Sequence, residues 1–221
     1  GPAMDVFDWM AGETGLPAPM TERELTEAYR RLREAAVRER TFAGGETIRR
    51  HGGPCDGFHF VVSGVVHFLR EDRQGAPMVF HVGLPGFWCG LGEIASRGGT
   101  RVALTALAAS PTTIASIDPE VVERMLQRDP VVRGFVDATL STRFSALLDL
   151  VATGLKSDPA ERLATRLLGF ARLNTVPWSL PARMEIPLSQ AVLSSLTGVS
   201  RQTVNRAMRQ LVESGAVQSI Y

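Results

Sequence analysis

The 221-residue sequence has little cysteine, almost no net charge and no long apolar run. Its two cysteines, Cys55 and Cys89, cannot build the disulfide framework of a small secreted protein, so we expect a reducing, cytoplasmic location. No apolar stretch approaches the roughly 20 residues of a membrane span, and no secretory signal pattern is visible, so we expect no membrane partner. The formal net charge is only +1. Any surface that binds nucleic acid must therefore be local.

The sequence also lacks the residue groups that catalysis or metal binding would need. No nucleophile is paired with a base, and no glycine-rich phosphate loop is present. Two distant cysteines cannot hold an iron–sulfur cluster. The histidines are scattered singly along predicted strands; they are His51, His59, His67 and His81. We expect no enzyme activity, no metal and no fixed cofactor, which leaves room for an unidentified small-molecule effector.

Residues 21–129 combine one helical pattern with several strand patterns. Thr21–Arg40 is predicted to be a helix, because Thr21 and Glu24 can form a capping box at its start. Short apolar runs separated by glycine turns follow over Thr41–Ile117. This spacing favours a small β-roll or barrel. Pro119–Arg128 is predicted to be a short helix.

The long helix predicted over Pro130–Lys156 carries apolar residues at near-heptad spacing. An apolar stripe this long and wide is typical of a seam between two helices, so we predict that two copies of the chain pair here. The alternative, that the stripe packs only against its own domain, stays open. The predicted dimerisation residues are Val136, Leu140, Phe144, Leu147 and Val151.

Two short helices around a tight turn are predicted from Leu188 to Val217. Pro187 prevents a helix from running in from upstream, and Gly198 allows the positive φ of a helix end. Ser200 is placed to cap the second helix. Asp158 can likewise cap an earlier helix that runs to Leu173. The segment from Gly215 starts a hairpin, so we expect a winged helix-turn-helix whose wing is incomplete in this sequence.

The polar face of the second short helix carries short polar and cationic side chains. Arginine matches the O6 and N7 atoms of guanine, and asparagine or glutamine matches adenine, while an arginine further along suits phosphate. The alternative is a helical hairpin with a solvated charged face. The predicted DNA-binding residues are Ser189, Gln190, Ser200, Arg201, Gln202, Thr203, Asn205, Arg206 and Arg209.

Three motifs together resemble the CRP/FNR (catabolite-activator/fumarate–nitrate regulator) family of bacterial transcription factors. The first is Gly57–Gly64, GFHFVVSG, which is similar to the family's strand-turn segment. The second joins Leu84–Gly86, Gly92–Ala95 and Arg101–Ala103, which resemble the family's phosphate-binding cassette. The third is Ser200–Arg206, SRQTVNR, which is similar to the family's recognition-helix motif.

The resemblance implies an α+β protein in four parts. It also implies a homodimer on a two-fold site in double-stranded DNA, with RNA polymerase as a further partner. The parts are residues 1–20, a tag scar and loose arm; 21–129, a cyclic-nucleotide-binding-like β-roll of jelly-roll type with flanking helices; 130–157, a dimerisation helix; and 158–221, a winged helix-turn-helix.

The cassette departs from the pattern of relatives that bind cyclic AMP. In those relatives Glu93 would take the ribose hydroxyl and Arg101 the cyclic phosphate, but Val102 stands where a hydroxyl side chain should follow. Leu147 and Leu148 stand where polar side chains should meet the adenine. The predicted effector-binding residues are Gly92, Glu93, Ile94, Arg101, Val102, Leu147 and Leu148.

We therefore expect a DNA-binding regulator whose roll does not use cyclic AMP in the usual way, because each lost polar partner costs about 1–3 kcal/mol. Three alternatives remain open. The chain could be an ordinary cyclic-nucleotide-dependent regulator, a regulator that binds DNA without any effector, or a sensor module that acts through a protein partner.

Overall fold

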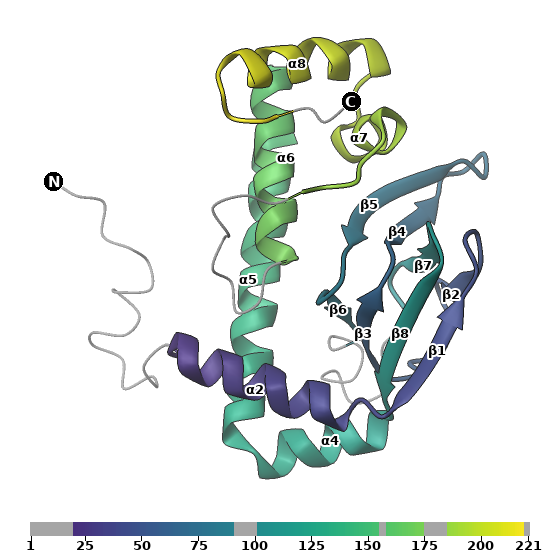
Figure 1. Ribbon diagram of the computed structural model, residues 1–221, viewed down its shortest axis with the longest axis vertical. Helices are drawn as coiled ribbons and strands as arrows, with labels where there is room; N and C mark the ends of the chain where they lie inside the picture. The colour runs from purple at the N-terminus through teal and green to yellow at the C-terminus, as the bar shows by residue number, and fades with distance from the viewer. Residues whose placement is uncertain (1–19, 91–100, 155–157, 175–184, 219–221) are drawn as a thin grey trace, which may run out of the picture.

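The computed structural model describes residues 20–90, 101–154, 158–174 and 185–218. Its strands form two four-stranded antiparallel sheets in the orders β1-β8-β3-β6 and β2-β7-β4-β5 (Figure 1). The predicted roll is thus confirmed. The strands are β1 (Arg38–Phe42), β2 (Thr47–Arg49), β3 (Phe58–Ser63), β4 (Val66–Glu71), β5 (Pro77–Gly83), β6 (Trp88–Cys89), β7 (Thr105–Ala108) and β8 (Thr112–Ile117).

The first described helix, α2 (Glu22–Ala35), begins as predicted but ends early. Both halves of the capping box form: the Glu24 amide donates to Thr21 Oγ1 at 3.3 Å, and the Thr21 amide donates to Glu24 Oε2 at 2.8 Å. The prediction that the helix reaches Arg40 is wrong. Residues Arg38–Phe42 instead form β1, because all five of them pair with β8.

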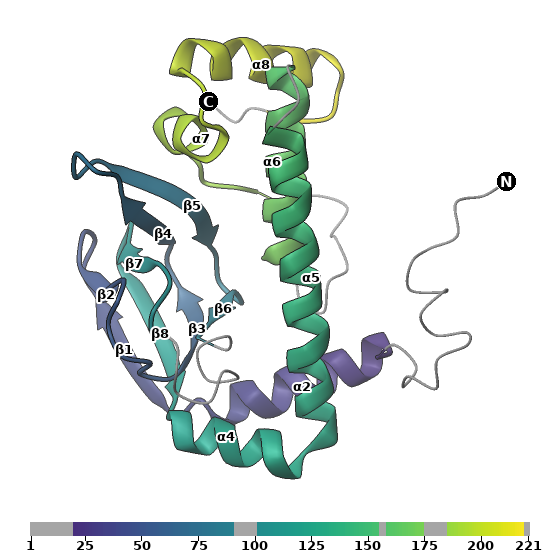
Figure 2. The same cartoon turned by 180° about the vertical axis from the view of Figure 1, so that it is seen from behind.

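Two helices, α4 (Pro119–Arg128) and α5 (Pro130–Gly154), follow the roll at the predicted places. Asp129 joins them, and its Oδ1 accepts hydrogen bonds from the amides of Val131 and Val132. Its other oxygen accepts from Arg31 Nη1 of α2 at 2.7 Å. With 25 residues, α5 is about 37 Å long, and α2 crosses its lower part (Figure 2).

The largest core lies where α2, α4 and the first half of α5 cover β3. Its centre is aromatic: Phe58, Phe60 and Phe135 are at most 1% exposed. Val136 belongs to the same cluster and is fully buried. Its predicted place on the dimer seam is therefore corrected, because a side chain inside its own domain cannot face a second chain. The remaining members of the cluster are Ala28, Leu32, Ala36, Trp88, Ala115, Ile117, Val122, Leu126 and Val132.

A second core fills the space between the two sheets. Alternate side chains of the strands point inward, as the two-residue period of a strand requires. The rings of Phe68 and Phe87 pack against each other there at a tilt, with centroids 5.2 Å apart. The other buried members are Phe42, Val61, Val66, Ala106, Ala108 and Ile114.

The C-terminal part consists of α6 (Pro159–Leu173), α7 (Gln190–Thr197) and α8 (Arg201–Glu213), which lie at the end of α5 remote from α4 (Figure 1). Asp158 Oδ1 accepts from the Ala160 amide at 2.9 Å, as predicted. The predicted loop 174–183 lies outside the described residues, apart from Asn174. The segment from Gly215 to Gln218 contains no strand, and the rest of the predicted wing lies beyond the described residues.

Gly64, in the turn between β3 and β4, lies too close to the neighbouring main chain to carry a side chain. Its φ is +87°, and a Cβ there would overlap the carbonyl oxygen of Pro111 and the hydroxyl of Thr112. Gly64→Ala should lower the free energy of unfolding by at least about 2 kcal/mol, because positive φ alone costs about 1–2 kcal/mol. Urea unfolding measures the change. Gly75→Ala is the matched control, since Gly75 has φ +82° and open space. An equal loss in both variants would contradict the close contact.

Candidate nucleic-acid interface

The helix-turn-helix forms through the local signals that the sequence carries. Ser189 caps α7 by accepting from the Val192 amide at 3.3 Å, and Ser200 caps α8 by accepting from the Thr203 amide at 3.2 Å. Gly198 ends α7 with a φ of 68°. The hydroxyls of Ser189 and Ser200 are therefore occupied as helix caps, although both residues were predicted as DNA contacts.

One face of α8 is buried and fixes the helix in its domain. Val204 and Ala207 are at most 2% exposed, and they pack with Leu163 of α6 and Leu193 of α7. Met208 and Leu211 extend this contact. The buried face that the sequence predicted for this helix is confirmed, so the orientation of the opposite face is determined by packing.

The opposite face of α8 is polar, cationic and open to solvent. Arg201, Gln202 and Arg206 are exposed in its first two turns, and Arg209 is exposed one turn further on. Thr203 and Asn205 are half-buried, and Gln190 of α7 is exposed. Within the described part of the chain, none of the three α8 arginines forms an ion pair. Their charges are therefore available to an anionic partner.

The second half of α5 exposes a stripe of large apolar side chains. Positions 140, 144, 147, 148 and 151 lie on one face of the helix, because they follow its three- and four-residue steps. They are Leu140, Phe144, Leu147, Leu148 and Val151, which are 37%, 61%, 53%, 53% and 59% exposed. We name this set the α5 stripe.

Only four of the predicted effector-binding residues, Arg101, Val102, Leu147 and Leu148, lie among the described residues. Gly92, Glu93 and Ile94 lie outside the described residues, while Leu147 and Leu148 belong to the exposed α5 stripe. Arg101 is exposed, and its Nη1 donates to the Gly52 carbonyl at 2.9 Å. Val102 is 3% exposed. Its amide donates to the Gly53 carbonyl at 3.0 Å, and its carbonyl accepts from the Gly52 amide at 2.9 Å.

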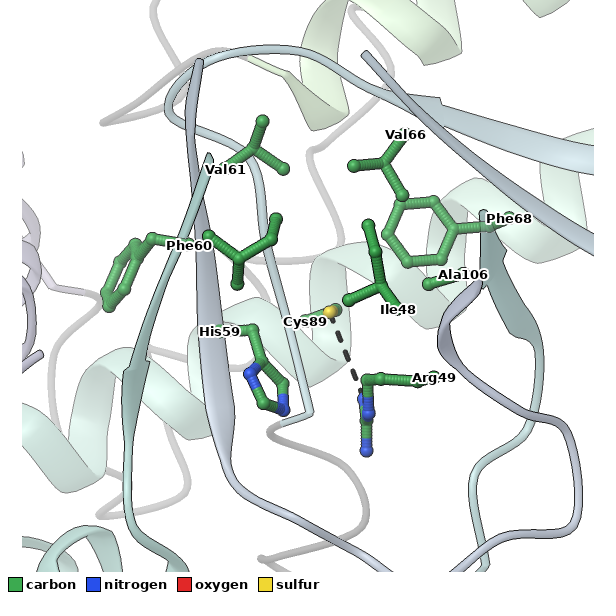
Figure 3. A pocket seen from close by; sticks show the side chains of 10 residues that line it. Ile48, Arg49, His59, Phe60, Val61, Val66, Phe68, Cys89 and Ala106 are labelled. Carbon is green, nitrogen blue, oxygen red and sulfur yellow. Dashed lines mark hydrogen bonds between the residues drawn. The ribbon is translucent and has the colours of Figure 1, made fainter. Parts of the chain in front are cut away.

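The space between the two sheets of the roll is nearly filled. It leaves a cavity of about 10 Å³, enough for about one water molecule, whereas sites for small ligands usually measure about 300–1,000 Å³. Figure 3 shows the polar side chains at its edge, Arg49, His59 and Cys89. The other lining residues are Ile48, Phe60, Val61, Val66, Phe68, Ala106 and Ile114.

A chain of polar side chains crosses this edge of the roll, and sequence reasoning missed it. Its Arg49 and His59 are each 6% exposed, whereas the side chain of Asp56 is 48% exposed. Arg49 Nε donates to Asp56 Oδ1 at 2.7 Å, and the same oxygen lies 3.1 Å from His59 Nε2. His59 Nδ1 lies 2.8 Å from Ser116 Oγ. Burial raises the pKa of Asp56, but His59 and Arg49 outweigh burial and hold it below its usual value.

Arg143 anchors α5 to the roll at Trp88 of β6. Its Nη2 donates to the Trp88 carbonyl at 2.7 Å, and its guanidinium carbon lies 4.0 Å from the centre of a Trp88 ring. In the sequence, this contact is indicated only by the position of an arginine among the apolar residues of α5. In the described residues, no three histidine, cysteine or acidic side chains gather as metal ligands would, and no described helix is long and apolar enough to cross a bilayer.

Two family models match the two parts of the chain. The cyclic nucleotide-binding domain matches residues 39–129, and the Crp-like helix-turn-helix domain matches residues 161–220. A protein that joins these two domains is a transcription regulator with a DNA-binding domain. The chain belongs to the CRP/FNR family.

Relatives and solved structures agree with this assignment. The chain is 24% identical over 173 residues to the cAMP-activated global transcriptional regulator CRP of Pasteurella multocida, covering 78% of this chain and 82% of the relative. The structure of FixK2 from Bradyrhizobium japonicum matches with a TM-score of 0.66 and 24% identity over 83% of this chain and 88% of that one. The c-di-GMP responsive regulator CLP of Xanthomonas campestris matches with a TM-score of 0.61 and 18% identity, covering 88% and 96%.

Proposed function

We propose that the chain is a homodimeric regulator that recognises a two-fold DNA sequence through the exposed face of α8. The observation that carries the proposal is the unpaired, cationic polar face of that helix, which its buried face holds outward. Arg201, Gln202, Asn205 and Arg206 lie in the first two turns, where a recognition helix reaches base edges. Arg209 lies further along and suits a phosphate.

In the proposed dimer, the α5 stripes of the two copies pack against each other. Its side chains are apolar and lie on one helix face, and water contact with such a surface is unfavourable by about 25 cal/mol per Å². Regulators of this family typically act as dimers. Pairing along α5 would place two α8 helices on half-sites roughly 34–36 Å apart. RNA polymerase is the further partner that family membership suggests.

The roll is proposed to act without cyclic AMP in its usual role. Val102 offers no hydroxyl to a phosphate, and Leu147 and Leu148 offer no polar partner to an adenine. The named relatives differ in their effectors, since one is cAMP-activated and another responds to c-di-GMP. Family membership therefore does not determine the effector.

Arg201→Ala should weaken binding to the operator by about 1–3 kcal/mol at one base pair per half-site, because a bidentate base contact is lost. Arg206→Ala should act in the same way. Arg209→Ala is the matched control: it should weaken all sequences alike and flatten the salt dependence. Fluorescence anisotropy on operator and random DNA measures both effects. If Arg201→Ala weakens random DNA as much as operator DNA, the base-reading role is wrong.

Replacing Leu140 and Leu147 together by Glu should give monomers with little operator affinity, because four buried carboxylates would oppose pairing in the dimer. Sedimentation velocity measures the change. Thr142→Glu with Ser145→Glu is the matched control, since both side chains are exposed on α5 outside the stripe. A dimer that survives the first pair of changes would place the interface elsewhere.

Cyclic AMP should bind weakly or not at all, and operator binding should be measurable without it. Two lost polar partners at about 1–3 kcal/mol each weaken binding by roughly tenfold to 10⁴-fold. Calorimetry with cyclic AMP and cyclic GMP, beside DNA binding with each, tests this. Val102→Ser should improve affinity if the cassette is otherwise intact. Micromolar affinity with a large gain in operator binding would restore the usual cyclic-nucleotide mechanism.

A further inference from the structure

The DNA-binding domain covers the open edge of the roll. β5 is an edge strand, and such a strand presents main-chain groups that no neighbouring strand pairs. The Val79 amide donates to Ser195 Oγ of α7 at 2.7 Å, and the Leu84 amide donates to Asn174 Oδ1 at 2.8 Å. Side chains of the DNA-binding domain thus satisfy two amides at this edge.

Asn174, directly after α6, uses its whole amide in this contact. Its Nδ2 donates to the carbonyls of Val82 and Phe170, each at 3.0 Å, and lies 3.3 Å from His81 Nε2. The side chain is 7% exposed and adjoins the buried cluster of Val82, Leu84 and Phe170. Because its Oδ1 accepts from an amide and its Nδ2 faces acceptors, its orientation is unambiguous.

His81 of β5 must be neutral in this arrangement. Its Nε2 faces the Nδ2 group of Asn174, which carries only hydrogens, so a proton on Nε2 would set donor against donor. The ring lies between Phe87 and Phe170, with centroids 4.7 and 5.3 Å away. The charged groups that face it are Arg143 of α5 and Arg166 of α6, both cationic. Burial, followed by these two charges, lowers the pKa of His81 to about 3.

We propose that His81, Asn174 and Ser195 form a latch that holds the DNA-binding domain on the β5 edge, and that protonation of His81 opens it. While the latch is closed, the polar face of α8 stays exposed and the domain keeps one orientation relative to the roll. Leu84 also begins the first segment of the predicted cassette, Leu84–Gly86. The hydrogen bond from its amide to Asn174 therefore connects that segment to the end of α6. The link to operator binding rests on the proposed function.

The direction of the pH dependence follows from the two states of His81. With the latch closed, the pKa of His81 is about 3; with it open, the imidazole regains a value near 6.5. The latch is therefore fully favoured above about pH 6.5 and weakens as the pH falls towards 3. Between pH 7 and pH 5 the closing equilibrium should fall about 25-fold.

Hydrogen exchange of the DNA-free protein, resolved to single amides by NMR, tests the latch. After correction for intrinsic exchange, protection of the Val79 and Leu84 amides should fall about 25-fold from pH 7 to pH 5. The β4–β5 ladder amides should keep theirs. His81→Phe should keep the protection and lose its pH dependence. The matched control is His67→Phe, which removes another partly buried histidine of the same sheet and should retain the pH dependence.

A second variant keeps the test decisive if His81→Phe does not fold. Asn174→Asp sets a carboxylate oxygen against the Val82 and Phe170 carbonyls, so both edge amides should lose at least tenfold in protection at pH 7. Protection that is equal at pH 5 and pH 7, or unchanged in Asn174→Asp, would overturn the latch. These readouts need no DNA, so a failure of the DNA-binding proposal would leave them intact.

Discussion

The contact between α5 and the aromatic side of the roll determines where everything else lies. The ring of Phe135 of α5 packs at a tilt against Trp88, with centroids 5.4 Å apart, and Trp88 in turn contacts Phe58 of β3 at 5.4 Å. Arg143 continues this contact about two turns beyond Val136, the last core residue of α5. Because the first half of α5 is part of the roll's own core, the direction of the helix is fixed. The exposed second half and the DNA-binding domain are placed by that direction.

Local signals allowed most helix boundaries of the fold to be predicted. Caps at Thr21 and Ser200, and the positive φ at Gly198, act within four residues and can be read directly from the sequence. The end of α2 could not be read this way. Arg38–Phe42 becomes a strand only because it pairs with β8, 70 to 78 positions away, and no local pattern contains that partner.

The candidate site was predictable to the same extent. The α8 face follows from helical periodicity within one element, so its exposed arginines and its buried Val204 and Ala207 could be predicted, whereas Thr203 and Asn205 are half-buried. Periodicity could not separate Val136, which the roll buries, from Leu140 onwards, because both belong to one apolar stripe. The contacts of Asn174 and Ser195 with β5 join segments about 90 and 116 positions apart, and polar residues in such places look like ordinary surface residues.

The first half of α5 belongs to the core of the roll and its second half carries the exposed stripe, so the roll cannot be separated from this helix. A fragment that stops at Asp129 would lack Val132 and Phe135, and it would leave the rings of Phe58 and Trp88 facing water. The roll is therefore not an autonomous folding unit at the boundary its strands suggest. A stable form of the roll therefore needs the first turns of α5. Because those turns belong to the core of the roll, a displacement of the far half of α5 also displaces side chains at the centre of the roll.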